Sequence, residues 1–257
     1  MKRNFKYLVA IVLLLASFSI STIAYGATVA TNDYYDFSCM LAYAKNNATP
    51  LYESPSEDSS VLDDFSAGDL VIVTDQIDDI WYKVENGHFE GYLRWNDFKF
   101  EDDELTDELI GCSIIHYKSS SSRDTNISIA ASKIDGMVIA PDERFVWSEV
   151  VGNPLPEDGY LDAPIILNRK AAVGVGGGIC QVSTALYNAV LDTEIPDSAI
   201  HVCHHSTGCA YADKNKDATV AYGSKDFYFK NTYDFPIKIR AYSYKAIVVV
   251  ELYKVVE

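Results

Sequence analysis

Residues 176–191 read Gly-Gly-Gly-Ile-Cys-Gln-Val-Ser-Thr-Ala-Leu-Tyr-Asn-Ala-Val-Leu. After the three glycines, apolar residues recur with the spacing of one helical face, at Val182, Ala185, Leu186, Ala189 and Val190. The pattern predicts a helix whose amino-terminal end carries Cys180. Unpaired backbone N–H groups and the positive end of the helix dipole lie at such an end, and both favour a thiolate over a thiol.

The glycine run and the residues beside Cys180 favour nucleophilic chemistry. Gly177 and Gly178 let a substrate carbonyl approach the backbone closely, and exposed amides of this loop can bind an anion. The backbone N–H of Cys180 and the side chain of Gln181 are therefore candidate donors to an oxyanion. The alternative is a glycine-rich turn with a buried cysteine that packs as a small hydrophobic residue.

The acidic composition limits the kinds of partner that the protein can bind. The 257 residues allow one large domain or two small ones, and the formal net charge is −16. Such a charge argues against binding nucleic acid through nonspecific attraction to its phosphates, and against binding anionic lipid through surface charge. We therefore expect no nucleic-acid partner, and the residues suggest no cofactor.

The amino-terminus is typical of an export signal. Basic residues within 2–6 precede an apolar run, 7–20, and a small-x-small cleavage site, 24–26. The apolar run is shorter than the roughly 20 residues that a membrane-spanning helix needs. We expect residues 1–26 to be a signal peptide, with an uncleaved anchor as the alternative. The mature protein is then extracellular, in the cell envelope.

Residues 42–100 contain short apolar segments separated by turn signals. Four motifs follow in order: Leu51-Tyr52-Glu53-Ser54-Pro55, Gly68-Asp69, Trp81-Tyr82-Lys83-Val84 and Gly91-Tyr92-Leu93. In this order they resemble a bacterial SH3-like domain, which implies a small all-β barrel that binds cell-wall glycan. A structural barrel without a ligand is the alternative. The acidic segment that follows, 101–112, is interpreted as a linker.

Residues 113–257 are interpreted as a second domain of the α+β class, with an antiparallel sheet and a central helix after the glycine run. The serine run at 119–122 is interpreted as a loop, and residues 126–134 predict a short helix. Strands are predicted at 138–141, 145–147, 164–167, 219–222, 227–229 and 237–256.

The second domain also carries an ordered set of motifs. These include Arg123-Asp124-Thr125-Asn126-Ile127, Gly176 to Thr184, His205-Ser206 and Asp217-Ala218-Thr219-Val220. Together they resemble the VanW family, first named from glycopeptide-resistance gene clusters. Some VanW-domain proteins are regarded as L,D-transpeptidases whose nucleophile is the cysteine of the glycine-rich motif. The resemblance implies that Cys180 is the nucleophile here.

The implied reaction is acyl transfer through a thioester. Cys180 attacks a peptide carbonyl in a peptidoglycan stem and expels a terminal D-Ala, and an amine of a neighbouring stem then accepts the acyl group to form a 3-3 cross-link. His205 matches the family's His-Ser pair and is the candidate base. Asp217 is the candidate partner that orients this imidazole, with Asp226 as the next choice.

Three further polar residues are candidates for the substrate site. Thr184 and Asn188 follow Cys180 at helical spacing, so we expect them to line the same site; capping or bridging neighbouring strands is the alternative. Arg123 is a candidate for binding a substrate carboxylate, and a structural ion pair is the alternative.

The five cysteines leave at least one thiol outside an intrachain disulfide. If Cys180 is free, the other four can form up to two bridges, and Cys203 with Cys209 is the simplest local pair. The run His201-x-Cys203-His204-His205-x-x-x-Cys209 also contains zinc-ligand types, but its compact spacing is not that of a recognised finger. We expect a disulfide beside a catalytic histidine and no metal.

The sequence thus predicts an exported enzyme whose partners are peptidoglycan stem peptides and, through the SH3-like domain, wall glycan. A membrane is a partner only if the signal is uncleaved. Two other functions remain open. One is a non-catalytic cell-wall-binding or scaffold protein, and the other is an L,D-carboxypeptidase that uses water as the acceptor.

Overall fold

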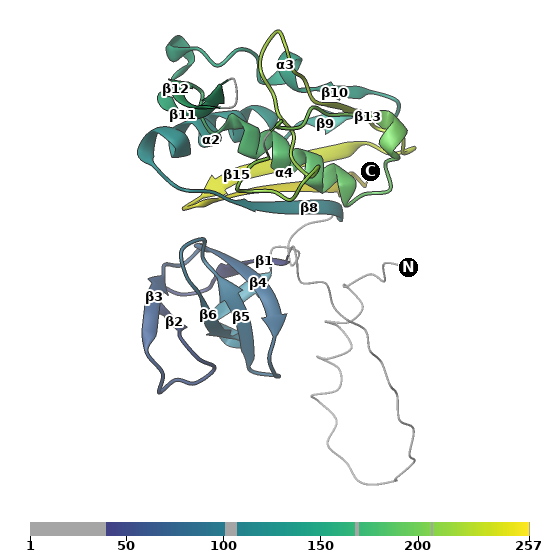
Figure 1. The fold of residues 1–257 in the computed structure, drawn as a ribbon. Helices are drawn as coiled ribbons and strands as arrows, with labels where there is room; N and C mark the ends of the chain where they lie inside the picture. Colours follow the sequence, from purple (N-terminus) through teal and green to yellow (C-terminus); the bar gives the residue numbers. More distant parts are fainter. Residues whose placement is uncertain (1–39, 101–106, 168–169, 207, 257) are drawn as a thin grey trace. The chain divides into compact units, whose positions relative to one another are not determined.

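The computed structural model describes residues 40–100, 107–167, 170–206 and 208–256 (Figure 1). The predicted signal peptide lies outside these ranges. The described chain is mostly β, with antiparallel sheets and a few helices, as the sequence predicted at this coarse level. Among the described residues, no helix is both long and apolar enough to cross a membrane.

Residues 40–100 form an antiparallel sheet of seven strands in the order β3-β2-β6-β5-β4-β1-β7. The strands are β1 (Met40–Ala44), β2 (Thr49–Tyr52), β3 (Val61–Phe65), β4 (Leu70–Gln76), β5 (Trp81–Glu85), β6 (Glu90–Arg94) and β7 (Phe98–Phe100). The predicted strands are present, because their apolar residues form the core of this sheet. Within residues 40–100 no closed barrel is found, so the SH3-like barrel is not confirmed.

The aromatic residues of this sheet pack mainly on one another. The buried rings of Tyr52 and Trp81 meet edge-on at 5.5 Å between centroids. Trp95, in the short 3-10 helix η1 (Trp95–Asp97), lies against Tyr82 at 5.4 Å and Phe98 at 5.9 Å. These contacts favour a core role for the aromatic residues over a ligand-binding face.

A four-stranded antiparallel sheet, in the order β8-β16-β15-β9, supports the carboxy-terminal half. Its strands are β8 (Glu108–His116), β9 (Val138–Ile139), β15 (Ile237–Tyr244) and β16 (Ile247–Lys254). The predicted long alternation is thus a hairpin that turns between Tyr244 and Ile247. β8 begins at Glu108 and pairs with β16, so residues 108–112 belong to this sheet and not to a linker.

Two helices pack on one face of this sheet (Figure 1). They are α2 (Ser121–Ile134) and α4 (Ile179–Leu191), and a one-turn helix, α3 (Trp147–Val150), follows β10 (Arg144–Val146). The predicted apolar face of α4 is buried against Ile239, Val248 and Val250. Helix α2 begins five residues earlier than expected, because Ser121 and Ser122 form its first turn instead of a loop.

Two smaller sheets complete the carboxy-terminal half. A three-stranded sheet, β10-β14-β13, contains β10 (Arg144–Val146), β13 (Ile200–His201) and β14 (Tyr228–Lys230). A hairpin pairs β11 (Asp162–Leu167) with β12 (Lys170–Val175). Single-turn 3-10 helices, η3 (Pro156–Asp158) and η4 (Asp197–Ala199), precede β11 and β13. The strand predicted at 219–222 is not formed.

The glycine run links the hairpin to α4 in a tight turn. Gly176 and Gly178 have φ of +79° and +120°, which side-chain-bearing residues rarely adopt. Gly177 approaches β11 so closely that a Cβ atom would lie 2.7 Å from the carbonyl oxygen of Ala163. The buried Asn126 of α2 locks this turn, since its amide donates to the Gly177 carbonyl at 2.9 Å. The turn therefore fixes where α4 begins.

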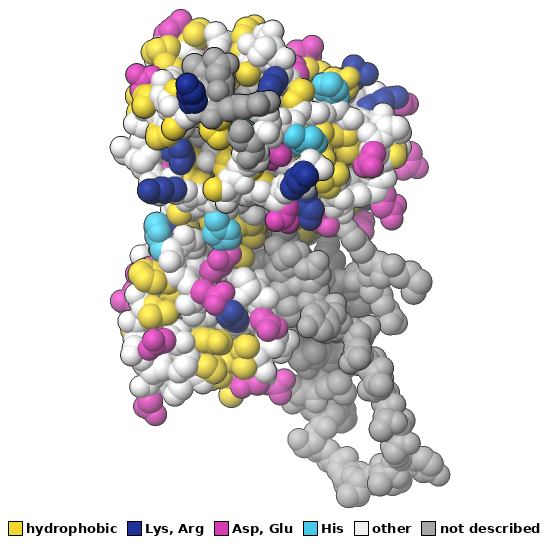
Figure 2. Space-filling model, viewed as in Figure 1, with side chains coloured by type: hydrophobic (Ala, Val, Ile, Leu, Met, Phe, Trp, Pro, Cys, Tyr) yellow, Lys and Arg dark blue, Asp and Glu magenta, His cyan; other side chains and the backbone are white. Residues whose placement is uncertain are grey.

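The surface carries its charges in mixed groups. On the face drawn in Figure 2, Asp and Glu side chains are scattered widely, and Lys and Arg side chains stand among them. This distribution is typical of a solvated acidic surface.

We expect Gly177→Ala to lower the free energy of unfolding by about 1–3 kcal/mol, because the new methyl group meets rigid backbone. Urea denaturation measures the change. Gly174→Ala is the matched control, since its methyl group would meet only the end of the flexible Ile165 side chain. Equal midpoints for the two variants would contradict the close approach.

Candidate active site

Cys180 is the second residue of α4, as the sequence predicted. It is half-buried, and its Sγ lies 3.5 Å from the carbonyl oxygen of Val220. Burial raises the pKa of the Cys180 thiol to about 11, and the hydrogen bond to Val220 and the charge of Lys225 offset only part of this rise. This direction is opposite to the lowered pKa that the sequence predicted, and burial is its largest cause.

A short irregular segment, residues 217–220, lies against the first turns of α4. The Ser183 hydroxyl donates to the Ala218 carbonyl at 2.7 Å, and the Ala218 N–H donates to the Thr184 hydroxyl at 3.0 Å. The expected strand is absent here, since side chains of a helix take the hydrogen bonds that a neighbouring strand would supply. The fully buried Thr184 therefore holds this segment and does not line a substrate site.

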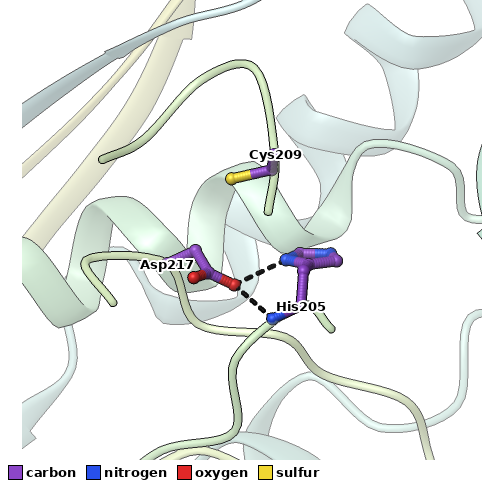
Figure 3. A group of neighbouring side chains, drawn as sticks. All are labelled: His205, Cys209 and Asp217. Atoms are coloured by element: carbon purple, nitrogen blue, oxygen red, sulfur yellow. Dashed lines mark hydrogen bonds and ion pairs between the residues drawn. The ribbon is translucent and has the colours of Figure 1, made fainter. Parts of the chain in front are cut away.

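Asp217, at the start of this segment, binds His205 by two contacts. Its Oδ2 lies 2.6 Å from the imidazole Nδ1 of His205 and accepts the backbone N–H of the same residue at 2.6 Å (Figure 3). Burial alone would raise the pKa of Asp217, but these hydrogen bonds and the charges of His205 and His204 hold it below its ordinary value. Because an ionised carboxylate only accepts, Nδ1 carries the proton and Nε2 is free to act as a base.

One segment thus contacts both the thiol and the imidazole. Asp217 binds His205, and three residues later Val220 contacts Cys180. The negative charge of Asp217 also contributes to the raised pKa of the thiol, which places the two groups within electrostatic reach. The predicted catalytic residues Cys180, His205 and Asp217 therefore belong to one neighbourhood.

The alternative orienting residue, Asp226, has other partners. Its carboxylate accepts the backbone N–H of Ser148 at 3.1 Å and also binds the Ser148 hydroxyl. Asp226 therefore fixes the start of α3, and Asp217 is the residue that orients His205.

The predicted substrate-binding residues have mostly structural contacts. Arg123 donates to the carbonyls of Lys118 at 3.1 Å and Pro164 at 3.2 Å, so part of its guanidinium is committed to the backbone. Gln181 is buried in the first turn of α4. Asn188 lies eight residues beyond Cys180, which is about 12 Å along a helix, so it does not line the site of the thiol.

The glycines also differ from their predicted role. Gly177 is buried and its carbonyl accepts from Asn126, while Gly178 faces the Arg123 side chain. Backbone conformation and close packing therefore explain why glycine occupies both positions. An anion-binding role for their amides stays a prediction.

The cysteines do not pair as expected. Cys180, Cys203 and Cys209 are free thiols, so the predicted bridge between Cys203 and Cys209 is wrong. Cys112 is disulfide-bonded. Instead of forming a bridge, the Cys209 side chain lies beside His205 and Asp217 (Figure 3).

Tyr211 is a site residue that the sequence did not indicate. Its ring lies edge-on to the His205 imidazole, with centroids 6.1 Å apart. Burial raises the pKa of Tyr211, and the charges of Cys180, Cys209 and Asp217 raise it further. Tyr211 thus lies beside His205 and Cys209 and within electrostatic range of Cys180 and Asp217. No spacing rule identifies this tyrosine, because it lies in an irregular loop.

A family model described as "VanW like protein" matches residues 122–253, more than half of the chain. The chain is a member of the VanW family. The match spans α2, the glycine turn, α4 and the His205–Asp217 pair, and it confirms the family predicted from the motifs. No solved structure matches this VanW-family chain.

Two curated relatives are similar to this chain. An "Uncharacterized protein YoaR" from Bacillus subtilis (strain 168) is 39% identical over 150 residues, which cover 58% of this chain and 49% of the relative. "Vancomycin B-type resistance protein VanW" from Enterococcus faecalis (strain ATCC 700802 / V583) is 29% identical over 117 residues, covering 44% of this chain and 42% of the relative. The match thus spans less than half of each relative.

We expect alkylation of Cys180 to increase with pH along a curve centred near pH 11. The test uses a Cys203→Ser/Cys209→Ser variant, iodoacetamide and mass spectrometry, with a urea-unfolded sample as the control that titrates at the ordinary thiol pKa. Because folding raises this pKa, the thiol's contribution to stability is present below the ordinary value and is lost as pH rises through about 11. A folded-state midpoint below that of the unfolded sample would contradict the burial argument.

We expect Thr184→Val to lower the free energy of unfolding by about 1–3 kcal/mol, because it leaves the Ala218 N–H buried without an acceptor. Thr184→Ser keeps the hydroxyl and is the conservative control. Chemical denaturation of both variants measures the difference. If serine and valine are equally destabilising, the hydrogen bond does not hold the segment.

Proposed function

We propose that this chain is an exported, cysteine-dependent L,D-transpeptidase that forms 3-3 cross-links between peptidoglycan stem peptides. The observation that carries the proposal is the contact between the buried Asp217 and His205, made by the segment that also contacts the Cys180 thiol. A nucleophile, a base and a residue that orients the base are the parts that cysteine acyl transfer requires.

The relatives support a role connected with the cell wall. One of them is named "Vancomycin B-type resistance protein VanW". An extracellular substrate also agrees with the predicted signal peptide at residues 1–26. Binding of wall glycan by residues 42–100 is part of the proposal and rests on the SH3-like motifs alone.

In the proposed first half-reaction, Nε2 of His205 takes the proton from the Cys180 thiol as sulfur attacks the donor carbonyl. At a pKa of about 11 only about one thiol in 10,000 is ionised at pH 7, so this proton transfer is essential. The tetrahedral intermediate collapses when its carbon–nitrogen bond breaks. The imidazolium returns the proton to the leaving amine of D-Ala, and a thioester remains.

The second half-reaction reverses the roles. An amine of a neighbouring stem attacks the thioester carbonyl and loses a proton to His205. The carbon–sulfur bond then breaks, the proton returns to sulfur, and an amide cross-link is formed. Asp217 keeps Nδ1 protonated and stabilises the imidazolium in both halves. With water as the acceptor, the same steps give an L,D-carboxypeptidase.

The raised thiol pKa favours a second candidate function. A thiol that stays protonated at rest is also what a non-catalytic wall-binding protein would carry, since buried cysteines pack as small hydrophobic residues. In that case the Asp217–His205 pair is structural.

The test incubates the protein with disaccharide-tetrapeptide muropeptides and identifies the products by mass spectrometry. Transpeptidation gives a cross-linked dimer with loss of D-Ala, and carboxypeptidation gives the tripeptide alone. We expect Cys180→Ala to abolish the product and His205→Gln to reduce its rate by about 10²- to 10⁴-fold. Cys203→Ser is the matched thiol control and keeps the activity.

Two other outcomes would contradict the proposal. Product that persists in Cys180→Ala would overturn the nucleophile assignment. If the wild-type protein forms no product but sediments with purified sacculi, the binding function replaces the enzymatic one.

A further inference from the structure

His205, Cys209 and Asp217 form a cluster of three different ligand types (Figure 3). One ligand atom from each, a ring nitrogen, a sulfur and a carboxylate oxygen, lies within 4.8 Å of the other two. Tetrahedral zinc binds these atom types at about 2.0–2.3 Å, which separates neighbouring ligand atoms by about 3.3–3.8 Å. Small side-chain movements therefore suffice to surround one cation.

The position of Cys209 suits it to this role. Its thiol is free of any disulfide, and its hydrogen-bond partners are Tyr211 and the Ala212 carbonyl, which lies 3.9 Å away. An isolated bridge pairs Cys209 with Ala212 in a tight turn, which holds the side chain beside the histidine–aspartate pair. Acyl transfer by Cys180 gives this second thiol no task.

The charge of the cluster favours a cation. The Asp217 carboxylate is buried, and its ion-pair partners among the described residues are the imidazoles of His205 at 2.6 Å and His204 at 3.5 Å. A buried carboxylate is stabilised by a compensating positive charge, and a divalent cation at this position would supply it.

We propose that His205, Cys209 and Asp217 bind a thiophilic divalent cation, Zn²⁺, with the fourth position open to water. Three protein ligands with water in the fourth position are the arrangement of open zinc sites, in contrast to structural sites with four protein ligands. Binding converts Cys209 to a thiolate and releases its proton to solvent. If Nδ1 of His205 is the ligand, the metal also replaces the short contact between this nitrogen and Asp217.

Zinc in this position inhibits the proposed transpeptidase, a consequence that rests on the proposed function. If the metal takes Nδ1 of His205, then Nε2 carries the remaining proton and cannot accept another. If the metal takes Nε2, the lone pair that serves as the base is occupied. Either way the imidazole no longer deprotonates Cys180, so the inference does not depend on which nitrogen binds.

The first experiment measures binding without any substrate. The protein is the full chain with Cys180→Ser, kept free of oxygen. One titration adds Zn²⁺ in competition with a chromophoric chelator to measure affinity, and a second adds Co²⁺ to detect metal–thiolate bonding. We expect about one Zn²⁺ per chain and a cobalt–thiolate charge-transfer band in the near ultraviolet. Cys209→Ser in the same background removes the band and weakens zinc binding by about 100-fold or more.

Cys203→Ser is the matched control, because Cys203 is a nearby free thiol outside the cluster. It keeps both the band and the stoichiometry. Circular dichroism verifies that each variant is folded. Absence of the band in the folded parent protein, or a band that survives Cys209→Ser, overturns the proposal.

A second experiment tests whether zinc inhibits the reaction, in protein that retains Cys180. The measured quantity is the amount of muropeptide dimer formed with Zn²⁺ divided by the amount formed without it. We expect this ratio to fall at least about tenfold in the parent protein and to stay near one in Cys209→Ser. If no dimer forms at all, the proposed function fails while the cobalt band still reports the metal site. If zinc binds but the ratio does not fall, regulation through His205 is overturned.

Discussion

The candidate site depends on the close approach of Gly177 to strand β11. Only a residue without a Cβ atom fits there, because the carbonyl oxygen of Ala163 would lie 2.7 Å from that atom. Asn126 holds the turn by bonding both Gly177 and the backbone of Leu161, so α2, the hairpin and the start of α4 meet at one buried amide. The position of Cys180 follows from this packing and not from the thiol's own contacts.

Helix α4 then acts as the template for the loop that faces it. Ser183 and Thr184 bind both backbone groups of Ala218, and from there the chain reaches Asp217 on one side and Val220 on the other. The short hydroxyl side chains of one helical turn therefore set the spacing between the thiol and the acid–base pair. The same geometry brings Cys209 toward the pair, although its sequence position resembles that of a disulfide partner.

Much of this arrangement could be predicted from the sequence. The glycine run, the apolar face of α4 and the long alternation near the carboxy-terminus are local patterns, and each predicted its element correctly. The pairing of His205 with Asp217 was predicted through the family motif, because no local rule links residues twelve apart in a loop. Three predictions were wrong. The strand at 219–222 and the bridge between Cys203 and Cys209 depend on tertiary contacts that a local pattern does not show. The site role of Asn188 neglected the rise of the helix between it and Cys180. The motif predicted a lowered pKa for the thiol, but a motif does not show how deeply a side chain is buried, and burial raises this pKa.

The segment at 217–220 couples two parts of the chain mechanically. It bonds Ser183 and Thr184 of α4 on one side and the backbone of Cys203 and His205 on the other, and its four residues are buried. The helix that carries Cys180 and the loop that carries His205 are therefore joined through one packed linker. A substitution within this linker that touches neither the thiol nor the imidazole is expected to displace one relative to the other, because tightly packed side chains transmit strain.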